Sequence, residues 1–151
     1  RILLRTGEVV DALSHFKRTL SLSPGRSEAY AGMAEALEQL RQLAPAIQAY
    51  ETAVERMPAK GKWWYRLGQL QLDNGARDAA TRSLSRAVKL GDRRQDRPLW
   101  VAEAHRIYAD SLMKQGRRTR ALDHYEAYLD RAPRDAIDRA EVTQILQAEQ
   151  R

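Results

Sequence analysis

Few side chains in this sequence could take part in catalysis or bind a metal. The chain has no cysteine and only three histidines, His15, His105 and His124. Metal-binding and catalytic histidines work beside a second ligand or a carboxylate at a defined spacing, and no such spacing occurs here. The glycine-rich phosphate loop, the Gly-x-Ser-x-Gly elbow and the dinucleotide glycine triplet are also absent. We therefore predict a protein that is not an enzyme and holds neither a cofactor nor a metal.

The three histidines are predicted to have structural or surface roles. His15 and His124 each precede an aromatic residue of an apolar helical stripe, so both should lie on the outer surface. His105 begins a stripe that continues with Tyr108 and Leu112, at spacings of three and four residues. This position favours a partly buried, hydrogen-bonded side chain over a ligand or a catalytic group.

The elements that would position these residues are indicated by an internal repeat. Apolar or small residues recur 34 positions apart in several registers, such as Ala12, Ala46 and Ala80, or Phe16, Tyr50 and Leu84. The next copy lies 41 positions on, because Gly75 is followed by Gly116 and Ala80 by Ala121. About seven additional residues are therefore expected between the third and fourth units.

Each unit reads as two amphipathic helices, since apolar residues recur at three- and four-residue steps. Small residues such as Ala34 and Gly68 are expected where two helices approach closely. Asn74 and Gly75 form a natural helix stop. The second helices should end before the prolines Pro24, Pro58 and Pro133, because proline cannot continue the helical hydrogen bonds.

This pattern resembles the tetratricopeptide repeat. Trp64 followed by Leu67 and Gly68 matches the opening of that repeat, and its close is matched by Ala46, Tyr50, Ala53 and Pro58. There are departures, because Tyr30 and His105 replace the opening Trp and Arg41 stands where a turn glycine is usual. The resemblance implies an all-α, right-handed solenoid of antiparallel helix pairs, with about three and a half repeats and a terminal helix.

On this interpretation the whole chain is one solenoid. Its first unit should begin inside a first helix, so an upstream segment, with any targeting information, is expected to be missing. Asp135 is the predicted N-cap of the last helix, whose apolar side includes Ile137 and Val142. The predicted division is 1–26 for a truncated first repeat, 27–60 and 61–94 for the next two, 95–101 for the insertion, 102–134 for the fourth repeat and 135–151 for a capping helix. The alternative for the last segment is the first helix of a further, truncated repeat.

In solenoids of this type the first helices line a concave groove, so the resemblance implies that a partner protein or peptide binds there. The expected contacts on these helices are Glu35, Glu38, Lys62, Tyr65, Gln69, Asp73, Arg106, Asp110 and Lys114. Tyr65, Gln69 and Arg106 are the strongest candidates, because Tyr and Arg often dominate binding energy. The Lys and Asn pattern that clamps a terminal carboxylate in chaperone-binding members is not matched, which disfavours a chaperone tail as the ligand.

The alternative is a basic surface that binds nucleic acid or an anionic membrane. Lys and Arg number 26 against 20 Asp and Glu, and residues 76–120 carry the whole excess. Arg82, Arg86, Lys89 and Arg93 should share one outer helix face. A solvated face is the simpler interpretation, because few aromatic residues stand near it to stack on nucleic-acid bases. Trp63 and Trp100 are expected to pack on neighbouring helices.

Composition also indicates the protein's environment and its source. No apolar run is long enough for a membrane span, so we expect a soluble protein, with the cytoplasm as the favoured compartment. The basic residues are mostly arginine, which indicates a GC-rich bacterial source. Self-association through the edge of the truncated first repeat is a further possibility.

Overall fold

The regular structure of the chain is entirely α-helical. The computed structural model describes residues 2–150, and their side chains from Thr6 onward, and no strand occurs in this part of the chain. The helices are α1 (Ile2–Leu22), α2 (Ser27–Gln39), α3 (Leu43–Arg56), α4 (Gly61–Asp73), α5 (Arg77–Asp92), α6 (Leu99–Lys114), α7 (Arg118–Arg131) and α8 (Arg139–Glu149). The all-α prediction is confirmed.

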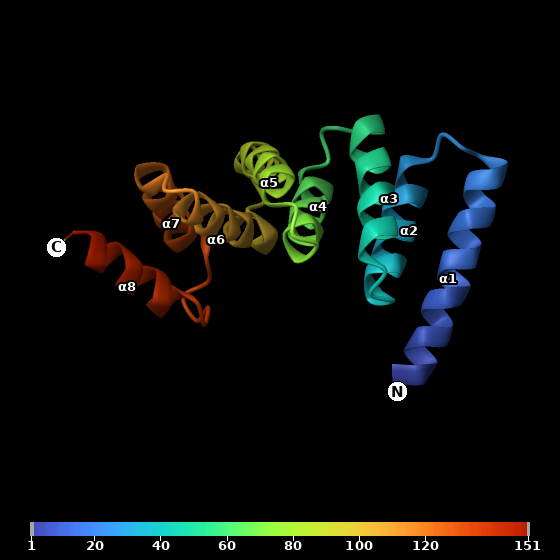
Figure 1. The fold of residues 1–151 in the computed structure, drawn as a ribbon, viewed down its shortest axis with the longest axis horizontal. Coiled ribbons are helices and arrows are strands. Elements are labelled where there is room, and N and C mark those ends of the chain that lie inside the picture. Colours follow the sequence, from blue (N-terminus) through green and yellow to red (C-terminus); the bar gives the residue numbers. More distant parts are fainter. Residues whose placement is uncertain (1, 151) are drawn as a thin grey trace.

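The helices are arranged as a row of pairs. Packing is most extensive within α2–α3, α4–α5 and α6–α7, while α1 covers α2 and α8 rests on α7. Figure 1 shows the result as an arch with α1 and α8 at its two ends, α4 on the inner side and α5 on the outer side. This repetition of helix pairs along one axis is that of an α-helical solenoid.

The turns inside the pairs share one geometry. Arg41, Gly75 and Gly116 have positive φ angles of 60°, 81° and 77°, and each follows the end of a first helix. The next residue donates its backbone N–H to the carbonyl five positions earlier, as Ala76 does to Gln71 at 2.8 Å. This is the Schellman ending, which reverses the chain within a few residues and favours glycine because left-handed backbone suits it best. Arg41 takes the same conformation in place of glycine, as its position in the repeat predicts.

Close packing between paired helices depends on small residues. Ala34, Ala46 and Ala80 are completely buried. A Cβ atom added at Gly68 would lie 2.8 Å from Cγ of Leu84, so a larger residue would force α4 and α5 apart. Pro24, Pro58 and Pro133 each stand two residues beyond the end of a second helix. Both features were expected from the repeat.

The insertion lies between the third and fourth units. Helix α5 continues to Asp92 and α6 begins at Leu99, so the additional residues lengthen α5 and form the link 93–98. Trp100 then packs into the core with 8% of its surface exposed, against Gly61 and Gly91, where an added Cβ would lie 2.8 Å and 3.0 Å from the indole. Trp100 therefore packs on neighbouring helices, as predicted.

The two ends of the chain differ from expectation. Helix α1 runs without a break from Ile2 to Leu22, so the predicted separate first helix at the start of the first unit is wrong. At the other end α8 begins at Arg139 with Asp138, not Asp135, in the N-cap position. Ile137 is 94% exposed because it precedes the helix, whereas Val142 is buried as predicted. No helix among residues 2–150 combines the length and apolar character needed to cross a membrane.

Candidate functional site

The predicted groove residues lie on the inner helices of the three pairs. Glu35 and Glu38 belong to α2, the set Lys62, Tyr65, Gln69 and Asp73 belongs to α4, and Arg106, Asp110 and Lys114 belong to α6. We call the face formed by α2, α4 and α6 the concave groove. Asp73 and Lys114 are exposed and make no ion pair or hydrogen bond among the described residues, whereas other charged side chains of the groove are already paired.

The first half contains a cleft of about 440 Å³, which we call the α2–α4 cleft. It brings together Glu35 and Lys62 from the predicted set. Its lining residues are Phe16, Glu28, Ala31, Gly32, Glu35, Tyr50, Lys62, Trp63 and Arg66. The ring of Phe16 lies so close to α2 that a Cβ at Gly32 would overlap it. Glycine at this position therefore allows an aromatic ring from α1 to form one wall.

Charges in the α2–α4 cleft are of two kinds. Arg66 donates a hydrogen bond from Nη2 to Oε2 of Glu38 at 2.5 Å, so this pair is engaged within the chain. Glu28, Glu35 and Lys62 are exposed and make no ion pair or hydrogen bond among the described residues. The cleft therefore presents uncommitted charge of both signs around an apolar centre. Arg66 was missed from sequence because its partner lies on another helix.

Tyr65 does not present a surface to a ligand. Only 3% of it is exposed, and its ring stacks on Trp100 with 5.9 Å between centroids. Its hydroxyl donates to Oε2 of Glu103 at 2.7 Å and accepts a hydrogen bond from Gln69 at 3.0 Å. Burial and the neighbouring carboxylate raise the pKa of Tyr65 well above its usual value. The expectation that Tyr65 is an open contact is therefore wrong, because Trp100 at the start of α6 covers it.

Arg106 is also held within the chain. Its Nη1 lies 3.4 Å from Oδ2 of Asp110, and its Nε lies 3.3 Å from Oδ2 of Asp138. The other carboxylate oxygen of Asp110 accepts a hydrogen bond from the hydroxyl of Tyr125. Burial, followed by the neighbouring Asp110, raises the pKa of that hydroxyl. We call Tyr65, Gln69, Glu103, Arg106, Asp110 and Tyr125 the inner network.

His105 and His124 form a buried polar pair. His105 is 2% exposed, and its Nε2 lies 2.8 Å from Oδ1 of Asp92, which also pairs with Arg131 at 3.2 Å. The Nδ1 atoms of the two histidines are 2.9 Å apart. Since the Asp92 carboxylate accepts from Nε2–H of His105, we assign Nδ1 of neutral His105 as the acceptor from His124. The expected burial of His105 is confirmed.

His124 is half-buried rather than on the outer surface, which corrects the sequence prediction. Its ring stacks on His105 and meets Tyr108 edge to face, with centroids 4.6 Å apart. Burial, followed by the neighbouring His105, lowers the pKa of His124 to about 4, and burial also lowers the pKa of His105. His15 is exposed, as predicted. Among the described residues, no group of three or more His, Asp or Glu side chains is placed to hold a metal ion.

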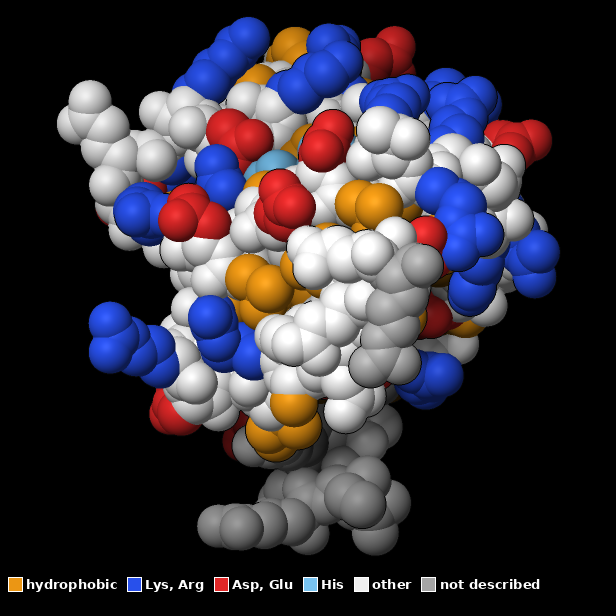
Figure 2. Space-filling view, turned by 90° about the vertical axis from the view of Figure 1, so that its left-hand side faces the viewer, with side chains coloured by type: hydrophobic (Ala, Val, Ile, Leu, Met, Phe, Trp, Pro, Cys, Tyr) orange, Lys and Arg blue, Asp and Glu red, His pale blue; other side chains and the backbone are white. Residues whose placement is uncertain are grey.

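The predicted basic stripe lies on the outer side of α5, and Arg82, Arg86, Lys89 and Arg93 are all exposed. The stripe is not a uniformly basic surface. Arg86 lies over the ring of Trp64 at 5.5 Å, and Arg82 and Arg86 share a cleft with Glu51 and Glu55 of α3. Figure 2 shows the same mixture at the C-terminal end of the arch, where Lys and Arg gather along the outer margin with Asp and Glu between them.

Comparison with known proteins identifies the family to which this row of helix pairs belongs. The tetratricopeptide repeat family model matches residues 1–60, 32–98 and 65–136. The chain belongs to the tetratricopeptide repeat family.

Individual relatives agree with this assignment. "Tetratricopeptide repeat protein 33" of Xenopus laevis is 35% identical over 82 residues, which are 54% of this chain and 32% of that protein. Among solved structures, YrrB, described as "a TPR protein with an unusual peptide-binding site", superposes with a TM-score of 0.72 and 22% identity, covering 85% of this chain and 63% of that one.

A thermophilic TPR protein of Thermus thermophilus superposes with a TM-score of 0.67 and 26% identity, covering 95% of this chain and 76% of that one. The matched region spans about a third of the length of the Xenopus relative. This chain therefore shares its fold with these structures and its family with these relatives.

Proposed function

We propose that this chain is a non-catalytic protein-interaction module that binds a peptide segment of a partner protein in the α2–α4 cleft. The observation that carries the proposal is the combination of uncommitted charge with apolar surface. Glu28, Glu35 and Lys62 have no internal partner among the described residues, and they surround Phe16 and Trp63. Unpaired charges at the rim of an apolar cleft orient a ligand, while the apolar part supplies binding energy.

The family supports this function. YrrB, a structural neighbour with the same fold, is described as having a peptide-binding site. The cleft in this chain joins the inner helices of two consecutive repeats, and a volume of about 440 Å³ is within the range of small ligand sites. A cleft of this size suits one or two side chains of a longer bound segment.

The charges define the ligand further. Glu28 and Glu35 stand two turns apart on α2, and Lys62 faces them from α4. A peptide with Lys or Arg beside an apolar side chain would place its cation against α2 and its apolar group against Trp63. For the terminal carboxylate of a peptide, the cleft offers only two cations, Lys62 and the already paired Arg66, so such a ligand is disfavoured.

Selection from a random peptide library tests the proposal directly. Peptides enriched on the wild-type protein should carry the basic and apolar pattern, and Glu28→Lys with Glu35→Lys should weaken them by about tenfold or more. Glu126→Lys, an exposed reversal on α7, controls for the general change in charge. Enriched peptides that bind the wild type and the cleft variant equally would place the ligand elsewhere.

The basic-surface alternative gives a different result in the same assay. A ligand held by phosphate contacts should weaken by about one log unit of affinity per log unit of salt for each contact. A peptide in the α2–α4 cleft depends on one or two ion pairs and on apolar contact, so its salt dependence should be shallow. A steep dependence that is unaltered by Glu28→Lys and Glu35→Lys would favour the basic stripe.

A further inference from the structure

A second cleft lies on the outer side of the arch, between α3 and α5 with α4 as its floor. Its volume is about 750 Å³. We call it the outer cleft. Glu51 and Glu55 stand on the α3 wall, Arg82 and Arg86 stand on the α5 wall, and the apolar floor includes Val54, Trp64 and Leu67. None of these residues belongs to the α2–α4 cleft, so this surface is separate from the site of the proposed function.

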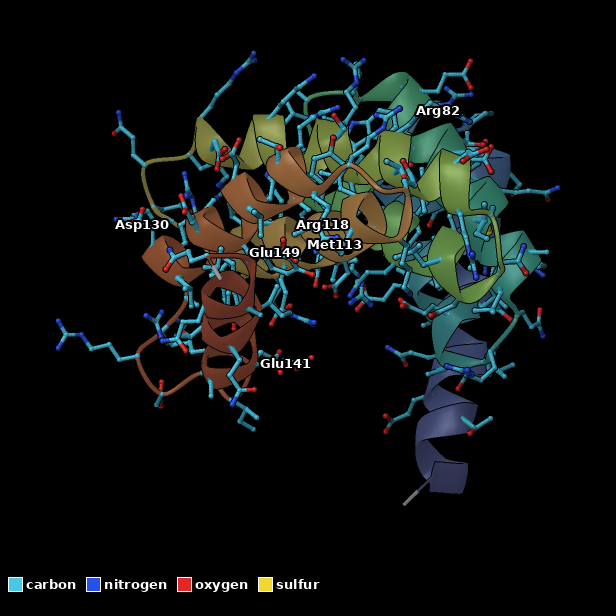
Figure 3. All side chains as sticks on the ribbon, turned by 60° about the vertical axis from the view of Figure 1, so that its left-hand side comes forward. Arg82, Met113, Arg118, Asp130, Glu141 and Glu149 are labelled. Atoms are coloured by element: carbon cyan, nitrogen blue, oxygen red, sulfur yellow. The ribbon has the colours of Figure 1, made fainter. Side chains whose placement is uncertain are left out.

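None of the four charged side chains on the walls is paired with an opposite charge in the described part of the chain. All four are exposed, and none of them makes an ion pair or a hydrogen bond among the described residues. The one polar contact is that of Arg86, whose guanidinium lies over the Trp64 ring at 5.5 Å. Figure 3 shows Arg82 on the outer side of the arch, well away from the Arg118 and Glu149 pair that joins α7 to α8. The acidic wall and the basic wall therefore face the same open space without neutralising each other.

An apolar group can lie over the floor without breaking the hydrogen bonds that its polar side chains make. The indole N–H of Trp64 donates to the carbonyl of Pro58 at 2.8 Å. Ser83 donates to Oε1 of Gln71 at 2.7 Å, so this buried pair also has its partner. An apolar side chain that enters between the walls would thus cover Trp64 and displace water, and it would break neither hydrogen bond.

Spacing along the walls matches one kind of ligand. Glu51 and Glu55 are four residues apart on α3, and Arg82 and Arg86 are four residues apart on α5. Each wall therefore presents two like charges separated by one helical turn. A helix that lies between α3 and α5 repeats its own side chains at the same interval, so its edges can meet both walls in register.

We infer that the outer cleft docks an amphipathic helix of a partner protein. The edge of that helix facing α3 carries Lys or Arg at i and i+4, the edge facing α5 carries Asp or Glu at i and i+4, and the apolar row between them covers Trp64. This is helix-in-groove recognition with charged edges that set the orientation. A nucleic acid does not fit this surface, because the acidic wall would lie against its phosphates.

Three designed helical peptides test the inference. They share one row of leucines and differ only at the edges, with one basic and one acidic edge, two basic edges or two acidic edges. Fluorescence anisotropy of labelled peptides should show that the full wild-type chain binds the mixed-edge peptide about tenfold more tightly than either of the others. Equal affinities for the three peptides, or no measurable binding of the mixed-edge peptide, would overturn the inference.

Charge reversal of each wall gives the sharper result. Glu51→Lys with Glu55→Lys should move the preference to the peptide with two acidic edges, and Arg82→Glu with Arg86→Glu should move it to the peptide with two basic edges. Circular dichroism checks that each variant keeps its helices. If neither reversal changed the order of affinities, docking in this cleft would be contradicted. It would also be contradicted if a DNA duplex bound the wild type and displaced the mixed-edge peptide.

Glu28→Lys with Glu35→Lys, on the inner side, serves as the matched control. It should leave the order of the three designed peptides unchanged, because those residues line the other cleft. Loss of library-selected peptides in this variant together with an unchanged order for the designed peptides would support both sites. Failure of one proposal is therefore distinguishable from failure of the other.

Discussion

The inner network and the outer cleft contain similar residues and use them differently. In the inner network Arg106 is paired with Asp110 and Asp138, and Tyr65 with Glu103. In the outer cleft the carboxylates of α3 and the guanidinium groups of α5 face each other across open space with no ion pair among the described residues. The difference arises because α6, α7 and the residues before α8 approach closely, whereas α3 and α5 are held apart by α4.

This comparison shows that the type and spacing of charged residues do not determine whether a charge is available. A side chain that is already paired and half-buried would have to break its internal contacts before it could bind a ligand. An exposed, unpaired side chain loses only its own conformational entropy and gains a new partner. The inner network should therefore stabilise the fold, and the outer cleft should leave stability almost unaffected.

Replacement of Tyr65 should have the largest effect on stability. Tyr65→Ala removes a buried ring from its stack with Trp100, so we expect the free energy of unfolding to fall by about 3–5 kcal/mol. Tyr65→Phe keeps the ring and loses the hydrogen bonds to Glu103 and Gln69, so a loss of about 1 kcal/mol is expected. Urea denaturation followed by circular dichroism measures both. A loss for Tyr65→Ala no larger than that expected for Tyr65→Phe would mean that the ring is not part of the core.

Removal of Arg106 should have the next largest effect. Arg106→Met leaves Asp110 and Asp138 without their cation in a half-buried setting, so a loss of about 1–2 kcal/mol is expected. Arg82→Met on the outer cleft removes an arginine without an internal partner and should change stability by no more than about 0.5 kcal/mol. Thermal denaturation of the two variants side by side makes the comparison. Equal losses would contradict the distinction between the two regions.

Acidic pH should act on the fourth repeat and not on the outer cleft, because the buried histidine pair lies between α6 and α7 and the outer cleft contains no histidine. Burial holds the pKa of His124 at about 4 and lowers that of His105, both below the value of 6.5 expected in an unfolded chain. Protonation therefore favours unfolding. The stabilisation is complete above pH 6.5 and is lost as the pH falls toward 4.

We expect the free energy of unfolding to be about 1–2 kcal/mol lower at about pH 5 than at about pH 7 for this reason. The charged groups that face the pair are Asp92 and Asp123, which favour protonation, and Arg120 and Arg131, which oppose it. His124→Gln should flatten the pH dependence measured by urea denaturation, while His15→Gln should leave it unchanged. An unaltered slope in His124→Gln would show that the pair does not set it.

The smallest effect is expected at the outer cleft itself. Arg86→Ala removes the cation from the face of Trp64 and should cost about 0.5 kcal/mol, with Arg86→Lys retaining part of that contact. Tryptophan fluorescence during urea denaturation measures the change. A loss in the free energy of unfolding above about 2 kcal/mol would indicate that Arg86 supports the fold and is not available to a ligand of the cleft.

The sequence was sufficient to predict the architecture because each element depends on local spacing. The 34-residue period placed the helix pairs, the turn at Gly75 and the buried Ala46 and Ala80 correctly. Arg41 was also predicted at a turn position normally taken by glycine, and its φ of 60° confirms this.

The candidate site was less predictable because its contacts join helices that are distant in sequence. Glu103 lies 38 residues from Tyr65, and no spacing within α4 indicates that the insertion brings Trp100 over that ring. His124 was placed on the surface from its own helix face alone, since its partner His105 belongs to another helix. An unpaired charge, such as Glu51 or Arg82, is likewise recognised only when every neighbouring helix is known.

Two double-mutant cycles would show whether the inner network is coupled and the charges of the outer cleft are not. One combines Tyr65→Phe with Glu103→Gln in the inner network, and the other combines Glu55→Gln with Arg86→Gln across the outer cleft. We expect a coupling energy of about 1 kcal/mol in the free energy of unfolding for the first pair and no coupling beyond about 0.3 kcal/mol for the second. Coupling of equal size in both cycles would contradict this expectation, because the outer charges would then already be engaged within the chain.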